Sequence, residues 1–408
     1  MFPAALLAVT LAATACGGTS ADTPRHSPAV SNFAFASQEQ QHTLAKADDA
    51  FARTLWTKLA QSDGNVVVSP ASIATALQMA YFGARGETAR QMARTLHLGP
   101  DATSGEVAAA ASALLAQIER AGDNESVLTV ADQVWVQRDF PVRPGFRATM
   151  SNAFDSAFHL ADFAGHSEDA RKAINTSVAT QTHDRIHDLL PPGLDLRDAR
   201  LILTNAIYLK AAWETPFDPS DTKPAAFTRA DGHTVHPATM HSDGQYDYAA
   251  TPSYQAIRLP YKGGRLAMTL LLPADGQPLA WPAMQPVFHS HEVNLAVPKF
   301  HFTWGADLAE MLSALGMPTA FTDAGDFSGI SAQPLHIGVV RHKAFIAVGE
   351  QGTEAAAATA VEMRVGAGYA PGQIATLHFD RPFLFRIDDT TTGLPLFLGK
   401  VADPTLGA

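Results

Sequence analysis

The chain has 408 residues and a mass of 43.3 kDa, and 46 % of its residues are hydrophobic, which is typical of globular proteins that bury a sizeable core. Twenty-nine Lys and Arg against 40 Asp and Glu give a net charge of −11, which argues against nucleic acid as a partner. A single cysteine excludes an intrachain disulfide framework and a CxxC metal site.

The N-terminal segment predicts export of the protein. Residues 2–15 are uncharged and apolar, are too short to span a bilayer comfortably and end in small residues, so we interpret residues 1–15 as a signal peptide. The only cysteine, Cys16, follows directly, as in bacterial lipoprotein signals in which this thiol is lipidated. An ordinary cleaved signal with a chance cysteine is the alternative, since no Lys or Arg lies near Met1.

Residues 16–38 are rich in Gly, Ser, Thr and Pro, which predicts a flexible tether. If Cys16 is lipidated, this tether joins the protein to a membrane of the cell envelope, and the lipid is the only expected contact with the membrane. If the signal is an ordinary one, the protein is secreted.

The remaining residues, 39–408, are predicted to form one large α+β domain. One helical face is marked by Leu44, Phe51, Leu55 and Leu59. The run Asn65–Val68 predicts a buried strand, and Ser69-Pro70 then begins a helix that is apolar nearly all round. Further strands are expected at Ser126–Gln137, Leu201–Tyr208, Tyr254–Leu259, Leu266–Leu272, Val293–Pro298, Leu335–Val348 and Phe383–Ile387, and further helices at Glu87–Leu98, Ser167–Leu190 and Ala306–Leu315.

No motif of a catalytic or metal site stands out in this domain. The sequence has no GxSxG elbow, HExxH, P-loop or EF-hand loop. His289 and His291 alternate, as on one face of a strand, but two imidazoles are half of a usual zinc site. We therefore expect no enzyme activity, no cofactor and no metal.

The segment from Glu350 to Ala360 consists mostly of small side chains. It is compatible with an alanine-rich helix, with a flexible linker or with a strand. As a strand, it would place Thr353, Ala355, Ala357 and Thr359 on one face. Four small side chains could enter a narrow slot in a sheet without overpacking it.

At this point the sequence resembles the serpin family, in blocks that follow the family's order from about residue 42 to Pro404. The blocks are NVVVSPASIATALQMAYFGARGETARQMARTLHL, LTNAIYLKAAWETPFDPSDTKPAAF, VPKFHFTWGADLAEMLSALGM, RHKAFIAVGEQGTEAAAATA and FDRPFLFRIDDTTTGLPLFLGKVADP. The resemblance implies an α+β serpin fold with three β-sheets, about eight to nine helices and an exposed reactive-centre loop at about residues 350–378.

The resemblance also implies an activity and a partner. Inhibitory serpins are suicide substrates: a target protease, of the serine or the cysteine class, attacks the loop and forms an acyl-enzyme, which is trapped as the cleaved loop inserts into the main sheet. We expect a monomer. The alternative is a non-inhibitory serpin that acts as a binding or carrier protein. The hinge favours an inhibitor, because its inward face carries only Thr and Ala.

Roles carry over where residues match the family. The hinge matches Glu350, Gly352, Thr353, Glu354, Ala355, Ala356, Ala357, Ala358 and Thr359, with Gly352 as the pivot. The shutter beneath the sheet matches Asn65, Ser69, Pro70, Ser72, Asn205 and His342, and the breach at its top matches Trp213. Taken alone, Ser69 and Ser72 would suggest helix capping and Trp213 core packing.

The reactive bond is expected between Gly366 and Ala367, if residues are counted from Gly352 as in typical inhibitors. Small residues there suit an elastase-like or subtilisin-like protease. The loop looks slightly longer than usual, so Arg364 (for a trypsin-like protease) and Tyr369 (for a chymotrypsin-like one) are the alternatives.

Overall fold

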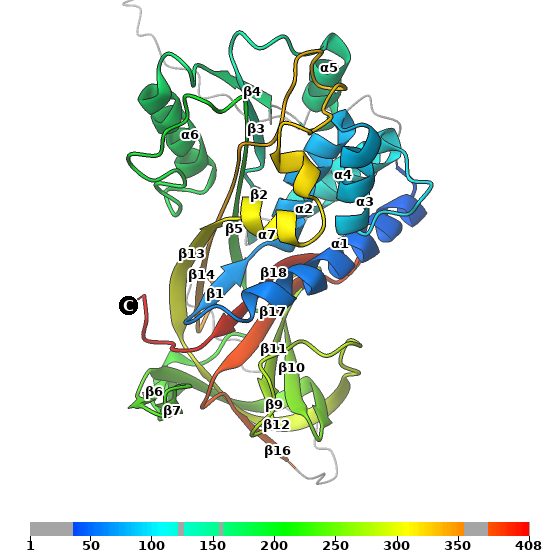
Figure 1. Ribbon diagram of the computed structural model, residues 1–408. Coiled ribbons are helices and arrows are strands. Elements are labelled where there is room, and N and C mark those ends of the chain that lie inside the picture. The colour runs from blue at the N-terminus through cyan, green and yellow to red at the C-terminus, as the bar shows by residue number, and fades with distance from the viewer. Residues whose placement is uncertain (1–35, 121–125, 155–157, 355–373, 408) are drawn as a thin grey trace, which may run out of the picture. The chain divides into compact units, whose positions relative to one another are not determined.

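Helices and sheets both contribute to the fold (Figure 1). The computed structural model describes residues 36–120, 126–154, 158–354 and 374–407. Within these residues the strands form three sheets, of nine, seven and two strands. The α+β class and the three sheets are confirmed. The described residues contain seven α-helices and two 3-10 helices, where about eight to nine helices were expected.

The first two helices begin at the caps that the sequence provides. Helix α1 (Gln38–Leu59) starts after Ser37, which forms a capping box with Gln40. Helix α2 (Pro70–Gly83) has Ser69 as its N-cap and Pro70 in its first turn, and almost all its residues are buried, as predicted. The other helices are α3 (Gly86–Thr95), α4 (Ser104–Arg120), α5 (Pro144–Ala153), α6 (Ser167–Gln181), α7 (Ala309–Ala314), η1 (Pro219–Asp221) and η2 (Pro318–Phe321).

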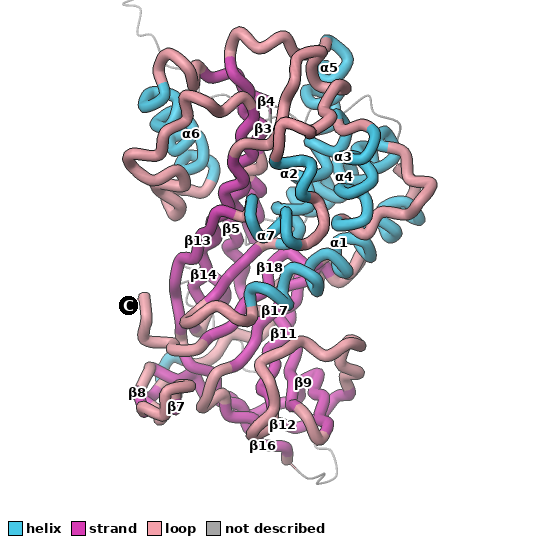
Figure 2. Tube along the Cα trace, viewed as in Figure 1, coloured by secondary structure: helices cyan, strands magenta, loops and turns pink. Residues whose placement is uncertain are grey.

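The seven-stranded sheet, called the central sheet below, has a group of helices on one side and α6 on the other. Its order is β13 (Phe300–Asp307), β14 (Val339–Gly349), β15 (Gly352–Thr353), β5 (Leu201–Ala212), β3 (Gln133–Gln137) and β4 (Phe158–Ala161), with β2 (Ser126–Val130) also pairing with β5. Successive side chains of β5 point to opposite faces of the sheet. Leu203 packs in the core that includes α2, and Ile202 packs in the core that includes α6. Figure 2 shows α2 to α5 on one side of β3 and β5 and α6 on the other.

The nine-stranded sheet supplies the second large core. Its strands are β1 (Val66–Val68), β18 (Pro395–Val401), β17 (Phe383–Asp389), β11 (Leu266–Pro273), β10 (Tyr254–Pro260), β9 (Ala238–Thr251), β12 (His289–Pro298) and β16 (Ala375–His378), with β6 (Lys223–Pro224) on β9. Strands β7 (Phe227–Thr228) and β8 (Thr234–Val235) form the small sheet.

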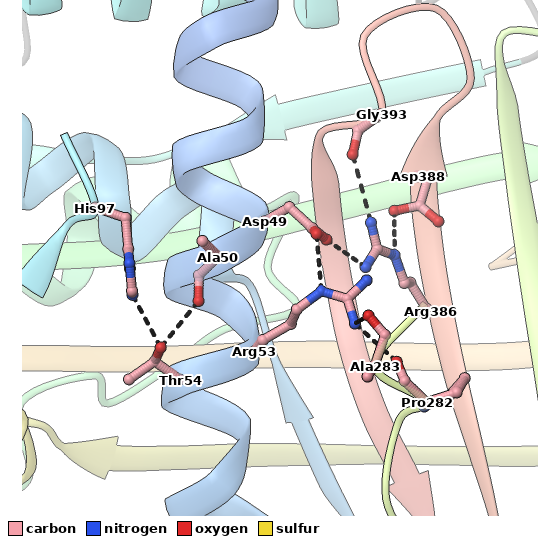
Figure 3. Close-up of polar contacts among 10 residues, drawn as sticks. All are labelled: Asp49, Ala50, Arg53, Thr54, His97, Pro282, Ala283, Arg386, Asp388 and Gly393. Carbon is pink, nitrogen blue, oxygen red and sulfur yellow. Dashed lines mark hydrogen bonds and ion pairs between the residues drawn. The ribbon is translucent and has the colours of Figure 1, made fainter. Parts of the chain in front are cut away.

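A cluster of charged side chains, here called the Arg386 brace, joins α1 to the β17–β18 hairpin (Figure 3). Arg386 on β17 contacts Asp49 Oδ1 at 2.6 Å and pairs with Asp388. Arg53 contacts the other oxygen of Asp49 at 2.9 Å and donates to the carbonyl of Pro282 at 2.8 Å. The brace therefore ties three separate segments together.

Several elements have boundaries that differ from the expected ones. The expected strand Ser126–Gln137 is two strands, because at the break the amide of Ala131 donates to Ala206 and the carboxylate of Asp132 accepts a bond from α2. The expected helix Ser167–Leu190 ends at Gln181, where His183 and Asp184 take positive φ angles.

The helix expected at Ala306–Leu315 is also shorter. Strand β13 continues to Asp307, whose carboxylate then accepts a bond from the amide of Ala309 at the start of α7.

Candidate functional site

The central sheet divides at one point, which we call the fork. Strands β5 and β14 pair directly and in parallel from Ile202 and Val339 as far as Ile207 and Ala344. Beyond that point β15 lies between them. Thr353 pairs with Val348 on β14 and with Ala211 on β5, both antiparallel. The first two residues after the β14 turn thus already form a strand inside the sheet.

Gly352 is required at the fork because the backbones approach closely there. Its φ is +147°, and a Cβ would collide with the carbonyl of Ala211 and lie 2.8 Å from the Cα of Ala212. Gly352 is paired on both sides and follows directly on the turn at Glu350 and Gln351. The left-handed residue is Glu354, at φ +49°.

Thr353 is only 2 % exposed and points into the core beneath the sheet. Its hydroxyl lies 2.6 Å from that of Tyr261, which has a raised pKa because it is buried. Trp213 stacks on Tyr261 at 4.5 Å between ring centroids and donates its indole N–H to the carbonyl of Gly349 at 3.0 Å. Trp213 therefore packs in the core and also holds the end of β14.

Glu350 anchors the turn between β14 and β15. Lys299 contacts its carboxylate at 2.9 Å, and the hydroxyl of Thr222 donates to it at 3.0 Å. Burial alone would raise the pKa of Glu350, but these bonds bring it below the ordinary value. The carbonyl of Glu350 also accepts from the amide of Phe217 at 2.9 Å.

A polar cluster lies under the directly paired part of β5 and β14. The amide of Ser69 donates to Nε2 of His342 at 3.2 Å, so the proton of a neutral ring is on Nδ1, which lies 3.2 Å from Oδ1 of Asn205. Burial lowers the pKa of His342 to about 3, which keeps the ring neutral. Three elements, α2, β5 and β14, meet in this cluster.

The other predicted shutter residues have different partners. The Ser69 side chain caps α2 through the amide of Ser72, so the capping role is present as well. The hydroxyl of Ser72 donates to buried Asp132. Asn65 makes its hydrogen bonds elsewhere, with the backbone of Ala402 and Asp403, and does not reach the His342 cluster through them.

The comparisons with known proteins agree with this architecture. The family model described as "Serpin (serine protease inhibitor)" matches residues 46–404. The chain belongs to the serpin family.

The similarity to relatives and to solved structures covers most of this serpin. An uncharacterized serpin-like protein of Thermococcus kodakarensis is 36 % identical and covers 90 % of this chain and 87 % of its own length. Human thyroxine-binding globulin with thyroxine has a TM-score of 0.81 at 26 % identity, over 90 % of this chain and all of that one. Serpin48 of the insect Tenebrio molitor, described as highly specific, has a TM-score of 0.76 at 28 % identity, over 90 % of this chain and 99 % of that one.

Family membership leaves the type of activity open. Serpins are typically protease inhibitors, and some members, including thyroxine-binding globulin and ovalbumin, are not. In the part of this serpin that the structure describes, no three His, Cys, Asp or Glu side chains are grouped to hold a metal ion. No described helix is both long and apolar enough to cross a membrane.

Several sites predicted from the sequence lie outside the described residues. These are Cys16, hinge residues Ala355, Ala356, Ala357, Ala358 and Thr359, and the reactive-bond candidates Arg364, Gly366, Ala367 and Tyr369.

Sequence reasoning missed five residues that contact the hinge or shutter of this serpin: Tyr261, Lys299, Thr222, Arg185 and Asp132. They belong to different segments and to no shared motif, so only the fold brings them to the site. The available signal is that Lys299 and Thr222 lie in blocks that resemble the family.

Proposed function

We propose that this serpin is a suicide-substrate inhibitor of serine or cysteine proteases that traps the acyl-enzyme by inserting its cleaved loop into the central sheet. The observation that supports this most is the strand Gly352–Thr353, which is hydrogen-bonded to β5 and to β14. The two strands diverge to admit it, and its one inward side chain is small and buried. Residues that continue in the same direction would extend this strand toward the His342 cluster.

Insertion has a physical driving force. Added loop residues exchange hydrogen bonds with water for bonds to strands on both sides, and their methyl groups leave water. The opposing cost is the loss of the direct pairs between β5 and β14, from Ile207 and Ala344 downward. The strand that precedes the loop, β15, is paired with β5 and β14, and the strand that follows it, β16, is paired with β12. An uncut loop is therefore held at both ends. Cleavage would release one end.

Complex formation tests this proposal directly. The protein is incubated with an elastase-like, a subtilisin-like, a trypsin-like and a chymotrypsin-like protease, and the products are separated on denaturing gels. We expect an SDS-stable complex with at least one enzyme. Mass spectrometry of the released C-terminal fragment identifies the bond, which we propose to be Gly366–Ala367. A fragment beginning at Val365 would assign it to Arg364, and one beginning at Ala370 to Tyr369.

A thermal melt separates an inhibitor from a non-inhibitory binding protein without knowledge of the target. Protein lacking residues 1–36 is compared intact and after cleavage in the loop. An inhibitor should gain a new central strand on cleavage, so its midpoint should rise by at least about 10 °C, whereas nicking an ordinary loop adds only chain freedom. An unchanged or lower midpoint would favour the carrier alternative.

We also propose that the protein is an exported monomer with a lipid on Cys16, and that residues 16–38 tether it to the cell envelope. The support is the position of the only cysteine directly after an apolar segment that ends in small residues. Mass spectrometry of the N-terminal peptide, with Cys16→Ser as the control, tests this. A peptide without lipid would favour secretion.

A further inference from the structure

The segment that follows α6 closes one face of the fork. Ile186 and Leu189 from this segment are buried against Ala206 of β5, and the ammonium group of Lys343 on β14 donates to the carbonyl of His187 at 2.5 Å. Arg185 lies in the same segment, and its guanidinium carbon is 5.9 Å from the ring centroid of Phe345. Phe345 is the first residue of β14 beyond the last direct pair with β5.

The hinge reaches this segment through Glu354. The Glu354 carboxylate forms an ion pair with Arg185, and its side chain is 10 % exposed against 52 % for Arg185. The amide of Glu354 still donates to Ala347 of β14 at 2.8 Å, but its φ of +49° is not that of a strand residue. Among the described residues, strand pairing on both sides therefore ends at Thr353.

We propose that Arg185 is a positioning residue that arrests strand addition at Thr353, because its ion pair holds Glu354 in the left-handed conformation and keeps the segment after α6 over the fork. The proposal rests on the proposed function. For the strand to lengthen, Glu354 must become extended and the segment must move away from Phe345. Both movements separate Arg185 from one of its two contacts.

Strand addition can be measured without a protease. A synthetic peptide with the sequence of residues 355–366, AAAATAVEMRVG, is offered to the intact protein, and its uptake is followed by native gel and by the rise in melting midpoint. The variant Arg185→Met keeps an aliphatic side chain against Phe345 and removes the charge. We expect it to take up the peptide about three to five times faster, the factor that corresponds to a partly exposed ion pair.

The matched control is Arg197→Met, which removes an arginine between α6 and β5 that is 70 % exposed and pairs with Asp195, away from the hinge. Its uptake rate should equal that of the wild type. Glu354→Gln should also accelerate uptake, and adding Arg185→Met to it should give nothing further, because both changes remove the same ion pair. A residue with a merely structural role would lower the melting midpoint of the peptide-free protein without this coupling to Glu354.

An uptake rate for Arg185→Met that is equal to or below that of the wild type would overturn the proposal, and so would additive effects in the double variant. If the wild type takes up peptide and forms protease complexes while the variants are unchanged, the inference alone fails. If the wild type does neither, the proposed function fails with it.

Discussion

Arg386 and Glu354 are both charged residues at a junction of several elements, one in the Arg386 brace and one at the fork. The guanidinium of Arg386 is 5 % exposed and bonds Asp49, Asp388 and the carbonyl of Gly393. Glu354 bonds half-exposed Arg185 through one oxygen, while in the described part of the chain its other oxygen has no hydrogen-bond partner.

Under the proposed mechanism, this difference means that the Arg386 brace stays fixed while the fork rearranges. Groups in the brace would lose several charged bonds at once if its elements moved, and buried unpaired charges are costly. At the fork, the side-chain groups that insertion would separate are the Arg185–Glu354 ion pair and the neutral ring of His342. Separating them costs less free energy, because the ion pair is partly exposed and the histidine carries no charge.

Thr353→Arg should have the largest effect, and it should affect function rather than folding. A guanidinium in the place of a side chain that is 2 % exposed beside Tyr261 cannot be paired there, so the hinge should leave the sheet. We expect the variant to be cleaved as a substrate with almost no SDS-stable complex. Thr353→Val, which has a similar shape and no charge, is the control and should still form complexes. Wild-type amounts of complex with Thr353→Arg would rule out insertion.

Arg386→Met should instead destabilise the whole fold. Removal of the guanidinium leaves Asp388 without its ion pair and Asp49 with Arg53 alone, so we expect a loss of about 3 kcal/mol in the free energy of unfolding. Urea denaturation measures it, with the exposed Arg197→Met as the control, expected within about 0.5 kcal/mol of the wild type. A loss no larger than that of the control would show that the brace is not fixed by its charges.

The third prediction concerns pH and His342. Because its pKa is about 3 in the folded protein and about 6.5 when unfolded, the unfolded state takes up a proton first, and stability is lost as pH falls from about 6.5 to 3. A His342→Gln variant lacks this titration. Between pH 7 and pH 4, the wild type should therefore lose about 3 kcal/mol of unfolding free energy relative to His342→Gln. Parallel curves for the two proteins would contradict a buried neutral ring.

Tyr261→Phe should have the smallest effect. It removes the hydroxyl bonded to Thr353 and keeps the ring that stacks on Trp213, so the cost should be about 1 kcal/mol. The loss should be local. Amide hydrogen exchange at Thr353 should accelerate, while exchange in β17 of the brace should not change. Equal acceleration at both places would mean that the fork and the brace unfold together.

Local signals predicted much of the fold. The Ser69-Pro70 start of α2 and the apolar strands follow from capping and periodicity, and the hinge is marked by its small side chains. The break at Asp132 and the end of α6 at Gln181 could not be predicted, because tertiary contacts with Ser72 and Ala206 and the positive φ angles that follow α6 decide them. The ion pair of Glu354 with Arg185 could not be predicted for a related reason, because the two residues are 169 positions apart in the chain.

The pairing of β5 with β14 has a consequence for biosynthesis. During synthesis β5 is complete once Ala212 has been made, but the neighbour on its open side begins only at Val339, after most of the nine-stranded sheet has been made. Until then the nascent chain carries an unpaired apolar strand edge from Leu201 onward, the kind of surface that joins other chains. Correct folding of each molecule therefore depends on keeping that edge apart from other chains until the last quarter of the polypeptide arrives.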